Sequence, residues 1–246
     1  MSDPSVLVVF LAALVTALAT GLGALPLLFT RASGDRALAL GNAVAAGLML
    51  AACHSLIVEG FAFDPARTLF GLLAGVVLVV VAGRFLHGHG DVSVADVKGA
   101  DAKRILLVVG IMTVHSAAEG VGVGVAFGGS MNLGEFITLA MALHNVPEGL
   151  AISLVMVPRG ASVLSAAGWS IFSSLPQPLL AVPAFLFVLL FQPLLPVGLG
   201  LAAGAMLWMV FAELLPEASE ATTTETLGVV VTVAFAAMLA VTLLLA

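Results

Sequence analysis

The sequence predicts an all-α, polytopic membrane protein, and its composition and apolar runs support that class. Of the 246 residues, 61% are hydrophobic and 9% are charged, and the mean hydropathy is +1.22. Soluble globular domains carry about 25% charged residues. The apolar runs exceed the roughly 20 residues that a spanning helix needs, and they lack the alternating pattern of an outer-membrane barrel. We therefore expect a bundle of membrane-spanning helices.

Eight spans can be drawn along the chain. Their approximate ranges are 5–30, 37–62, 68–87, 104–128, 132–156, 162–191, 195–216 and 224–246. Each is long enough to cross a bilayer with some tilt. The connections are short, except for a loop over about residues 88–103. Because no stretch has the composition of a soluble domain, we expect residues 1–246 to form a single transmembrane domain.

Net charge and cysteine content exclude a nucleic-acid surface and an intramolecular disulfide. The net charge is −6, which indicates no nucleic-acid surface. The single cysteine, Cys53, excludes an intramolecular disulfide. The N-terminus lacks the basic residues of a secretory signal, so we interpret the first apolar run as a retained helix.

The basic residues predict the orientation of the chain. Seven of the eight fall in loops on one side, namely Arg31, Arg36, Arg84, Lys98, Lys103, Arg104 and Arg159. Only Arg67 lies on the opposite side. The positive-inside rule then places both termini outside the cell and the 88–103 loop in the cytoplasm. The Gly and Asp content of this loop predicts that it is flexible.

Two internal similarities predict inverted repeats. Residues 45–50 (AAGLML) in span two and 202–207 (AAGAML) in span seven are identical at five of six positions. These two spans cross the membrane in opposite directions. Spans four and five also share a motif, described below, and also run in opposite directions. A 3+2+3 arrangement of spans with a polar site at the repeat interface is typical of transporters.

The shared motif pairs a histidine with a glutamate four residues later. It reads His115 to Glu119 in span four and His144 to Glu148 in span five, and a glycine follows each glutamate. Residues four apart lie on one face of a helix, so each span presents an imidazole and a carboxylate together. If the two faces meet, they form a His₂Glu₂ cluster near the middle of the membrane.

A metal site explains this cluster better than helix-to-helix hydrogen bonding does. An ionised side chain at the bilayer centre costs about 2.5–3.5 kcal/mol on insertion scales, and interhelical contacts are made more cheaply by Ser, Thr or Asn. Two carboxylates and two neutral imidazoles balance the charge of one divalent cation. Mixed His and carboxylate donors favour Zn²⁺ and other first-row divalent metals over Ca²⁺ or Mg²⁺. Pro147 frees the Leu143 carbonyl next to the motif.

These residues resemble a known family. The segment 144–149 (HNVPEG) is similar to the signature of ZIP (Zrt/Irt-like protein) divalent-metal transporters, and 115–120 is similar to its partner motif. The resemblance covers essentially the whole chain and includes eight spans with both termini outside. It implies a carrier that brings Zn²⁺, or Fe²⁺, Mn²⁺ or Cd²⁺, into the cytoplasm across a prokaryotic cell membrane. A homodimer is compatible with the resemblance.

The resemblance also implies the site residues. The primary metal site consists of His115, Glu119, His144 and Glu148, with Met49 as a neighbour. A second site in the family shares the two glutamates, and here its further positions are Ser116, Asn145 and Gln177. All three are neutral, so we expect a second ion to be held weakly or transiently.

Further polar residues are candidates for an exit path. His87, His89 and Asp91 in the long loop, and Glu213 and Glu217 at the end of span seven, lie on the predicted cytoplasmic side. A solvated loop and helix-end solvation are equally acceptable readings of these residues. The alternative function is an intramembrane metal-dependent hydrolase, which would need three protein ligands, an open position and a general base. No separate base stands out, so we expect no enzyme.

Overall fold

The computed structural model describes residues 4–29, 35–86 and 100–245, and within them the chain is helical throughout, without a strand. The helices are α1 (Val6–Leu22), α2 (Asp35–Phe63), α3 (Pro65–Leu86), α4 (Ala100–Gly129), α5 (Met131–Met156), α6 (Val163–Ser174), α7 (Pro176–Leu190), α8 (Leu195–Met209), α9 (Leu215–Glu220) and α10 (Thr224–Leu245). Short helices η1 (Leu25–Leu28), η2 (Val157–Arg159), η3 (Gln192–Leu194) and η4 (Val210–Leu214) adjoin them. The predicted all-α class is confirmed.

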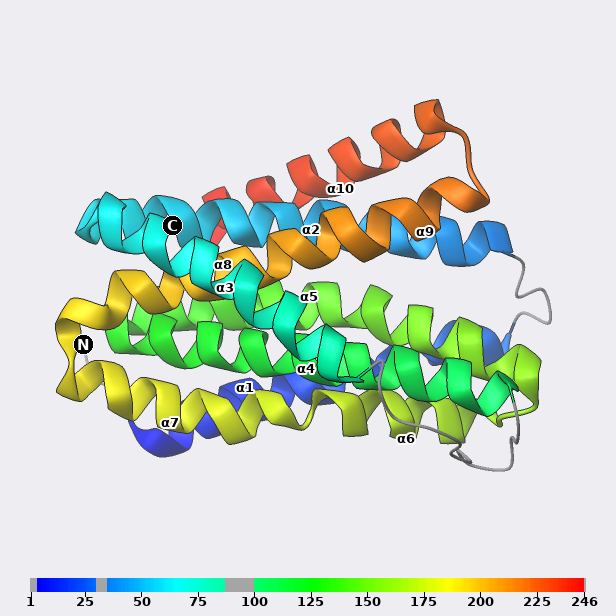
Figure 1. Cartoon of the computed structure of the whole chain (residues 1–246), viewed down its shortest axis with the longest axis horizontal. Coiled ribbons are helices and arrows are strands. Elements are labelled where there is room, and N and C mark those ends of the chain that lie inside the picture. The colour runs from blue at the N-terminus through cyan, green and yellow to red at the C-terminus, as the bar shows by residue number, and fades with distance from the viewer. Residues whose placement is uncertain (1–3, 30–34, 87–99, 246) are drawn as a thin grey trace.

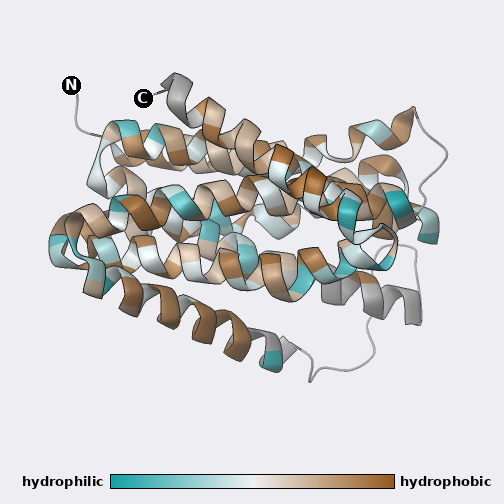
Figure 2. Ribbon diagram, turned by 90° about the horizontal axis from the view of Figure 1, so that it is seen from above, coloured by the Kyte–Doolittle hydropathy of each residue, from teal (hydrophilic) through white to brown (hydrophobic). Residues whose placement is uncertain are grey.

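The predicted spans correspond to these helices. Six helical segments in the described part are long and apolar enough to cross a membrane, namely Val6–Leu28, Arg36–Phe63, Met131–Arg159, Val163–Leu190, Gln192–Glu220 and Thr224–Val241. The remaining two predicted spans are α3 and α4. Figure 2 shows hydrophobic residues along the full length of the helices, with hydrophilic residues scattered between them. The protein is therefore a multi-pass membrane protein.

The structure departs from the predicted spans at three places. Span six divides into α6 and α7 at Leu175, because Pro176 has no N–H to continue the helix. Span seven contains the π-helix η4 between α8 and α9, a rare local widening that is common at functional sites. The predicted 88–103 loop is too long, because α4 already begins at Ala100. Residues 87–99 lie outside the described residues.

The helices pack as two bundles (Figure 1). The first bundle contains α1, α4, α5, α6 and α7, and the second contains α2, α3, α8, α9 and α10. The bundles meet mainly where α2 packs on α5 and where α4 packs on α8. The N-terminus and the C-terminus lie toward the same end of the molecule (Figure 1).

The packing has the pairwise correspondence that inverted repeats require. The contact of α3 with α8 matches that of α10 with α2, and the contact of α4 with α7 matches that of α5 with α1. The two bundle-to-bundle contacts, α2 on α5 and α8 on α4, form a third such pair. Each bundle thus takes helices from both repeats, which the sequence did not predict.

Within each bundle, glycines bring helix backbones into direct contact. A Cβ atom on Gly75 of α3 would lie 2.2 Å from the carbonyl oxygen of Leu201 on α8. A Cβ atom on Gly124 of α4 would lie 2.1 Å from the carbonyl oxygen of Ala181 on α7. Neither neighbour can move aside without moving its helix. Small residues that allow such close approach are the usual means of fixing helix pairs in membranes.

Between the bundles, glycines meet side chains instead. A Cβ atom on Gly122 of α4 would lie 3.0 Å from the Cβ atom of Ala202 on α8. A Cβ atom on Gly41 of α2 would lie 3.5 Å from Leu150 Cδ2 on α5, which is an ordinary van der Waals distance. The backbones are therefore tightly fitted inside each bundle, and the contact between bundles is made through side chains.

The loops at one end are tied together by Arg67. Its side chain lies 3.4 Å from the Asp64 carboxylate, and its Nη1 donates to the carbonyl of Pro193 at 3.0 Å. The turn between α2 and α3 and the segment between α7 and α8 therefore lie on the same side, as the predicted spans require. Which side faces the cytoplasm remains a prediction from the basic residues.

The glycine contacts predict a sharp difference between two similar substitutions. Gly75→Ala places a methyl group against a backbone carbonyl, and overpacking of this kind costs about 1–3 kcal/mol. Gly168→Ala in α6 meets nothing within 4 Å, and alanine is the better helix former by about 1 kcal/mol. Thermal unfolding of the purified protein in detergent should show a lower midpoint for Gly75→Ala and an unchanged or higher one for Gly168→Ala. Equal midpoints for the two variants would contradict the fitted packing.

Candidate metal centre

The α4–α5 hairpin brings the two His/Glu motifs together. α4 ends at Gly129, and Ser130 caps α5 by accepting a hydrogen bond from the Leu133 N–H at 3.1 Å. His115 lies 15 residues before Ser130, and His144 lies 14 residues after it. Because both helices rise by about 1.5 Å per residue, the two histidines reach the same height from the turn.

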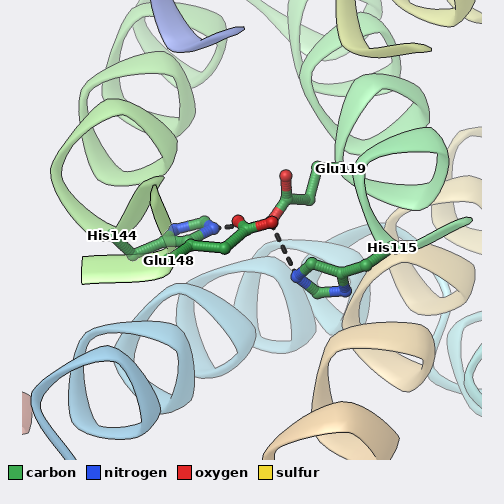
Figure 3. A group of neighbouring side chains, drawn as sticks. All are labelled: His115, Glu119, His144 and Glu148. Atoms are coloured by element: carbon green, nitrogen blue, oxygen red, sulfur yellow. Dashed lines mark hydrogen bonds and ion pairs between the residues drawn. The ribbon is translucent and has the colours of Figure 1, made fainter. Parts of the chain in front are cut away.

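The four side chains point toward one another from α4 and α5 (Figure 3). One ligand atom from each of His115, Glu119, His144 and Glu148 lies within 4.8 Å of the others. Exposure is 1% or less for three of these residues and 4% for Glu148. The predicted His₂Glu₂ cluster is thus present among the described residues.

Glu119 is the hub of the cluster. Its Oε1 lies 2.6 Å from His144 Nε2 and 2.8 Å from His115 Nε2, the second as a charge contact rather than an aligned hydrogen bond. His144 Nδ1 lies 3.2 Å from the carbonyl oxygen of Ala140. A proton on Nδ1 would donate to this carbonyl and leave the Nε2 lone pair for a metal, a common way of orienting a metal-binding histidine.

Glu148 has no such support. Both of its carboxylate oxygens are buried and have no hydrogen-bond partner among the described residues, and neither does His115 Nδ1. Two negative charges about 5 Å apart repel by about 3–4 kcal/mol even at an effective dielectric of 20. Buried polar groups are normally paired, so this arrangement lacks a positive charge. A divalent cation among the four ligand atoms would supply it.

The cluster suits tetrahedral coordination. With bonds of about 2.0–2.2 Å to nitrogen and oxygen, tetrahedral ligand atoms lie roughly 3.3–3.5 Å apart. The 2.6 Å and 2.8 Å contacts on Glu119 Oε1 would lengthen, and the wider separations, up to 4.8 Å, would contract. Small side-chain movements are sufficient, because all four residues already face a common point.

The predicted second-site residues are also buried here. Gln177 of α7 donates from Nε2 to Glu119 Oε2 at 2.6 Å, and Asn145 Nδ2 donates to Gln177 Oε1 at 3.1 Å. Ser116 Oγ is buried without a hydrogen-bond partner among the described residues. The structure therefore brings both amides beside the centre, where Asn145 donates to Gln177 and Gln177 donates to Glu119.

The sequence analysis did not identify two buried, hydrogen-bonded polar residues. Thr16 of α1 is fully buried, and its hydroxyl hydrogen-bonds to Gln177 Oε1. The signal was Thr16 and Thr20 four residues apart in an otherwise apolar span. Asn42 of α2 is also fully buried and donates to Glu217 at 3.0 Å. The signal for Asn42 was the free-energy cost of placing a side-chain amide inside a membrane-spanning helix.

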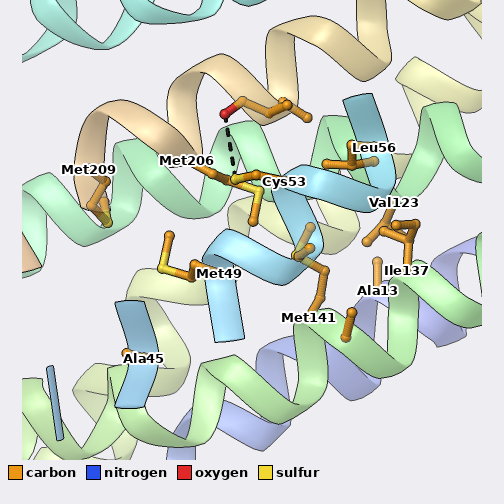
Figure 4. Close-up of a cluster of buried hydrophobic side chains, with 14 of the residues drawn as sticks. Ala13, Ala45, Met49, Cys53, Leu56, Val123, Ile137, Met141, Met206 and Met209 are labelled. Atoms are coloured by element: carbon orange, nitrogen blue, oxygen red, sulfur yellow. Dashed lines mark hydrogen bonds between the residues drawn. The ribbon is translucent and has the colours of Figure 1, made fainter. Parts of the chain in front are cut away.

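Met49 is buried on α2 within an apolar cluster that includes Cys53, Met206 and Met209 (Figure 4). The Cys53 thiol donates weakly to the Ala203 carbonyl at 3.7 Å, which agrees with a packing role. Since α2 packs on α5, Met49 is on the helix that faces the centre. Its contact with a bound ion remains a prediction.

The predicted exit residues divide into two groups. Glu213 is half-buried in the π-helix η4, and Glu217 lies one turn further on in α9, where it accepts the Asn42 hydrogen bond. His87, His89 and Asp91 lie outside the described residues. A role in metal exit remains a prediction for all five.

Fold and site together define a class: a multi-pass helical membrane protein with a buried His₂Glu₂ centre between antiparallel helices. Comparison with known proteins agrees with this class. The chain matches the ZIP zinc transporter family over residues 87–246, and it belongs to that family.

Three relatives illustrate the match. The zinc transporter GufA of Myxococcus xanthus is 33% identical over 222 residues, which are 84% of this chain and 86% of GufA. The zinc transporter ZIPB of Bordetella bronchiseptica is 34% identical over 214 residues, covering 81% of this chain and 69% of ZIPB. The Arabidopsis thaliana protein At3g08650, named as a candidate zinc transporter, is 46% identical over 237 residues. These are 95% of this chain, which spans 38% of the plant protein.

The unpaired state of Glu148 leads to a prediction for metal binding. Glu148→Gln removes one of two anionic ligands and also removes the repulsion between the carboxylates. The metal-free variant should therefore be at least as stable as the wild type, yet Zn²⁺ should no longer raise its unfolding temperature. A ligand present at 100 times its dissociation constant stabilises by about 2.7 kcal/mol, so the shift is measurable by thermal unfolding in detergent. A full zinc-induced shift in Glu148→Gln would exclude this carboxylate as a ligand.

Proposed function

We propose that this protein carries Zn²⁺ across the membrane through the centre formed by His115, Glu119, His144 and Glu148. The observation that carries the proposal is the convergence of two buried carboxylates and two imidazoles, in which Glu148 has no hydrogen-bond partner in the part of the chain that the structure describes. One divalent cation would neutralise the carboxylates. The relatives GufA and ZIPB, which are named as zinc transporters, support the assignment.

The donor set favours zinc among the candidate substrates. Imidazole nitrogen and carboxylate oxygen suit Zn²⁺, and they also accept Fe²⁺, Mn²⁺ and Cd²⁺, whereas Ca²⁺ and Mg²⁺ prefer sites built from oxygen alone. We propose Zn²⁺ as the main substrate and the other three as weaker ones. Inward transport across a prokaryotic cell membrane follows the family resemblance, and the distribution of basic residues supports only the orientation of the chain in that membrane.

The packing supports a movement of one bundle against the other. All four ligands lie in the first bundle, whose helices are held together by glycine contacts such as that of Gly124 with Ala181. The contact with the second bundle is made through side chains, as at Gly122 and Ala202. A movement of one repeat against the other is less suitable, because each bundle contains helices from both repeats. Bundle movement would expose the centre to each side in turn.

The hydrolase alternative is not favoured. The ZIP family consists of transporters, and the chain belongs to it. A hydrolytic metal site needs an open coordination position and a general base. Among the described residues, the only His/Cys/Asp/Glu cluster of three or more that could hold a metal is the four-residue centre itself, so a fourth ligand would have to double as the base.

Proteoliposome uptake tests the proposal directly. Vesicles containing the purified wild type and a trapped zinc-sensitive dye should accumulate Zn²⁺. Glu148→Gln should reduce the initial rate at least tenfold, because one anionic ligand is lost. Glu135→Gln, on the exposed surface of the same helix, is the matched control and should retain the wild-type rate. Wild-type vesicles that take up no more Zn²⁺ than empty vesicles would exclude transport.

A disulfide between the bundles tests the movement. Gly122 and Ala202 face each other across the α4–α8 contact, so in a Cys53→Ala background Gly122→Cys with Ala202→Cys should cross-link on oxidation. Uptake should stop in the oxidised protein and return on reduction, while each single cysteine variant stays insensitive to oxidant. Undiminished uptake in a fully cross-linked sample would show that the bundles do not move at this contact.

A further inference from the structure

A buried polar chain runs from α1 through α5 and α7 to the metal centre. It consists of Thr16, Asn145 and Gln177, each fully buried, and it ends on Glu119. None of the three belongs to the four-residue centre. Polar side chains of this kind can link helices by hydrogen bonds alone, but this chain ends on a carboxylate of the candidate centre and therefore also affects the charge there.

The hydrogen bonds fix the orientation of both amides. Asn145 Nδ2 lies 2.8 Å from the backbone carbonyl of Thr16, which can only accept, so this atom must be the NH₂ group. The same NH₂ donates to the next atom in the chain, at 3.1 Å, which must therefore be Gln177 Oε1. Gln177 Nε2 is then the atom that faces Glu119 Oε2, at 2.6 Å. Turning the Gln177 amide over would place two donors against each other.

The two oxygens of Glu119 consequently have different environments. Oε1 faces the imidazoles of His115 and His144, where an ion would bind. Oε2 already accepts from the Gln177 amide, whose N–H groups carry partial positive charge. A second ion bridging from Oε2 would have to displace that amide. It would gain only neutral ligands in exchange.

The polar chain is fixed to the centre mechanically as well. A Cβ atom on Gly120, next to Glu119, would lie 2.5 Å from the backbone carbonyl of Gln177. A Cβ atom on Gly149, next to Glu148, would lie 1.7 Å from the carbonyl of Thr20. α1 and α7 thus sit against α5 and α4 at the height of the ligands. The amide stays beside Glu119 in any movement of the bundle as a unit.

We infer that the Gln177 amide occupies the position of a second cation, so that the centre holds one divalent ion per chain, and that Gln177 is a positioning residue for Glu119. The inference rests on the proposed function. When the ion leaves, the amide continues to orient Glu119 and partly balances its charge. When the ion is bound, two carboxylates match one divalent charge, and a second ion would leave an excess of two positive charges in the membrane interior.

Counting bound ions tests the inference. Purified protein in detergent, equilibrated with excess Zn²⁺ and freed of unbound metal, should contain one zinc per chain by elemental analysis. The double variant Gln177→Glu with Asn145→Asp supplies two further carboxylates in the same positions and should contain two. Two tightly bound ions in the wild type, or one in the folded double variant, would overturn the inference. If the double variant does not fold, the wild-type count decides.

Affinity tests the positioning role. Gln177→Leu should still bind one ion, with affinity lowered on the order of 10–100-fold, as is typical when a group that supports a metal ligand is removed. Gln192→Leu, in the short helix η3, is the matched control and should bind zinc like the wild type. Unchanged affinity in Gln177→Leu would overturn the positioning role. Absence of zinc binding and uptake in the wild type would instead overturn the proposed function, so the two failures are distinguishable.

Discussion

Two carboxylates buried at the middle of a membrane-spanning bundle require compensation, and most of the site follows from how each obtains it. Glu119 is compensated by the protein itself: two imidazoles approach Oε1, and the Gln177 amide donates to Oε2. Glu148 is buried beside it without a partner among the described residues. This difference favours the proposed binding of one divalent ion, which would give Glu148 a partner and offset the charges of both carboxylates.

Close packing at glycines fixes the helices that hold the centre. Glycines inside each bundle bring backbones so close that a methyl group would collide with a carbonyl, as at Gly75 and Gly124. Between the bundles, at Gly122 and Gly41, side chains separate the backbones. Van der Waals contact, rather than a hydrophobic driving force, holds helices together in lipid. The fit is therefore closest within the unit that carries the ligands and less close where that unit meets the rest.

Much of this protein could be predicted from its sequence, since the bilayer imposes rules that depend on sequence alone. Long apolar runs predicted the helices, and the cost of charge in lipid marked His115, Glu119, His144 and Glu148 as a site. Their spacing of four predicted the shared faces. Local interruptions of the helices were harder to predict. Pro176 divides one predicted span and η4 widens another, and both depend on which hydrogen-bond partners the backbone groups find in the folded protein.

The sequence by itself determined the class, the spans and the four converging side chains, because hydropathy and helical periodicity are local properties of the chain. Only the tertiary structure decided that the repeats exchange helices to form two bundles, since glycine contacts between distant segments select the neighbours. It also decided that Thr16 and Asn145 hold the Gln177 amide against Glu119. The direction in which an amide donates is set by the partners around it, and those partners come from three different helices, α1, α4 and α5.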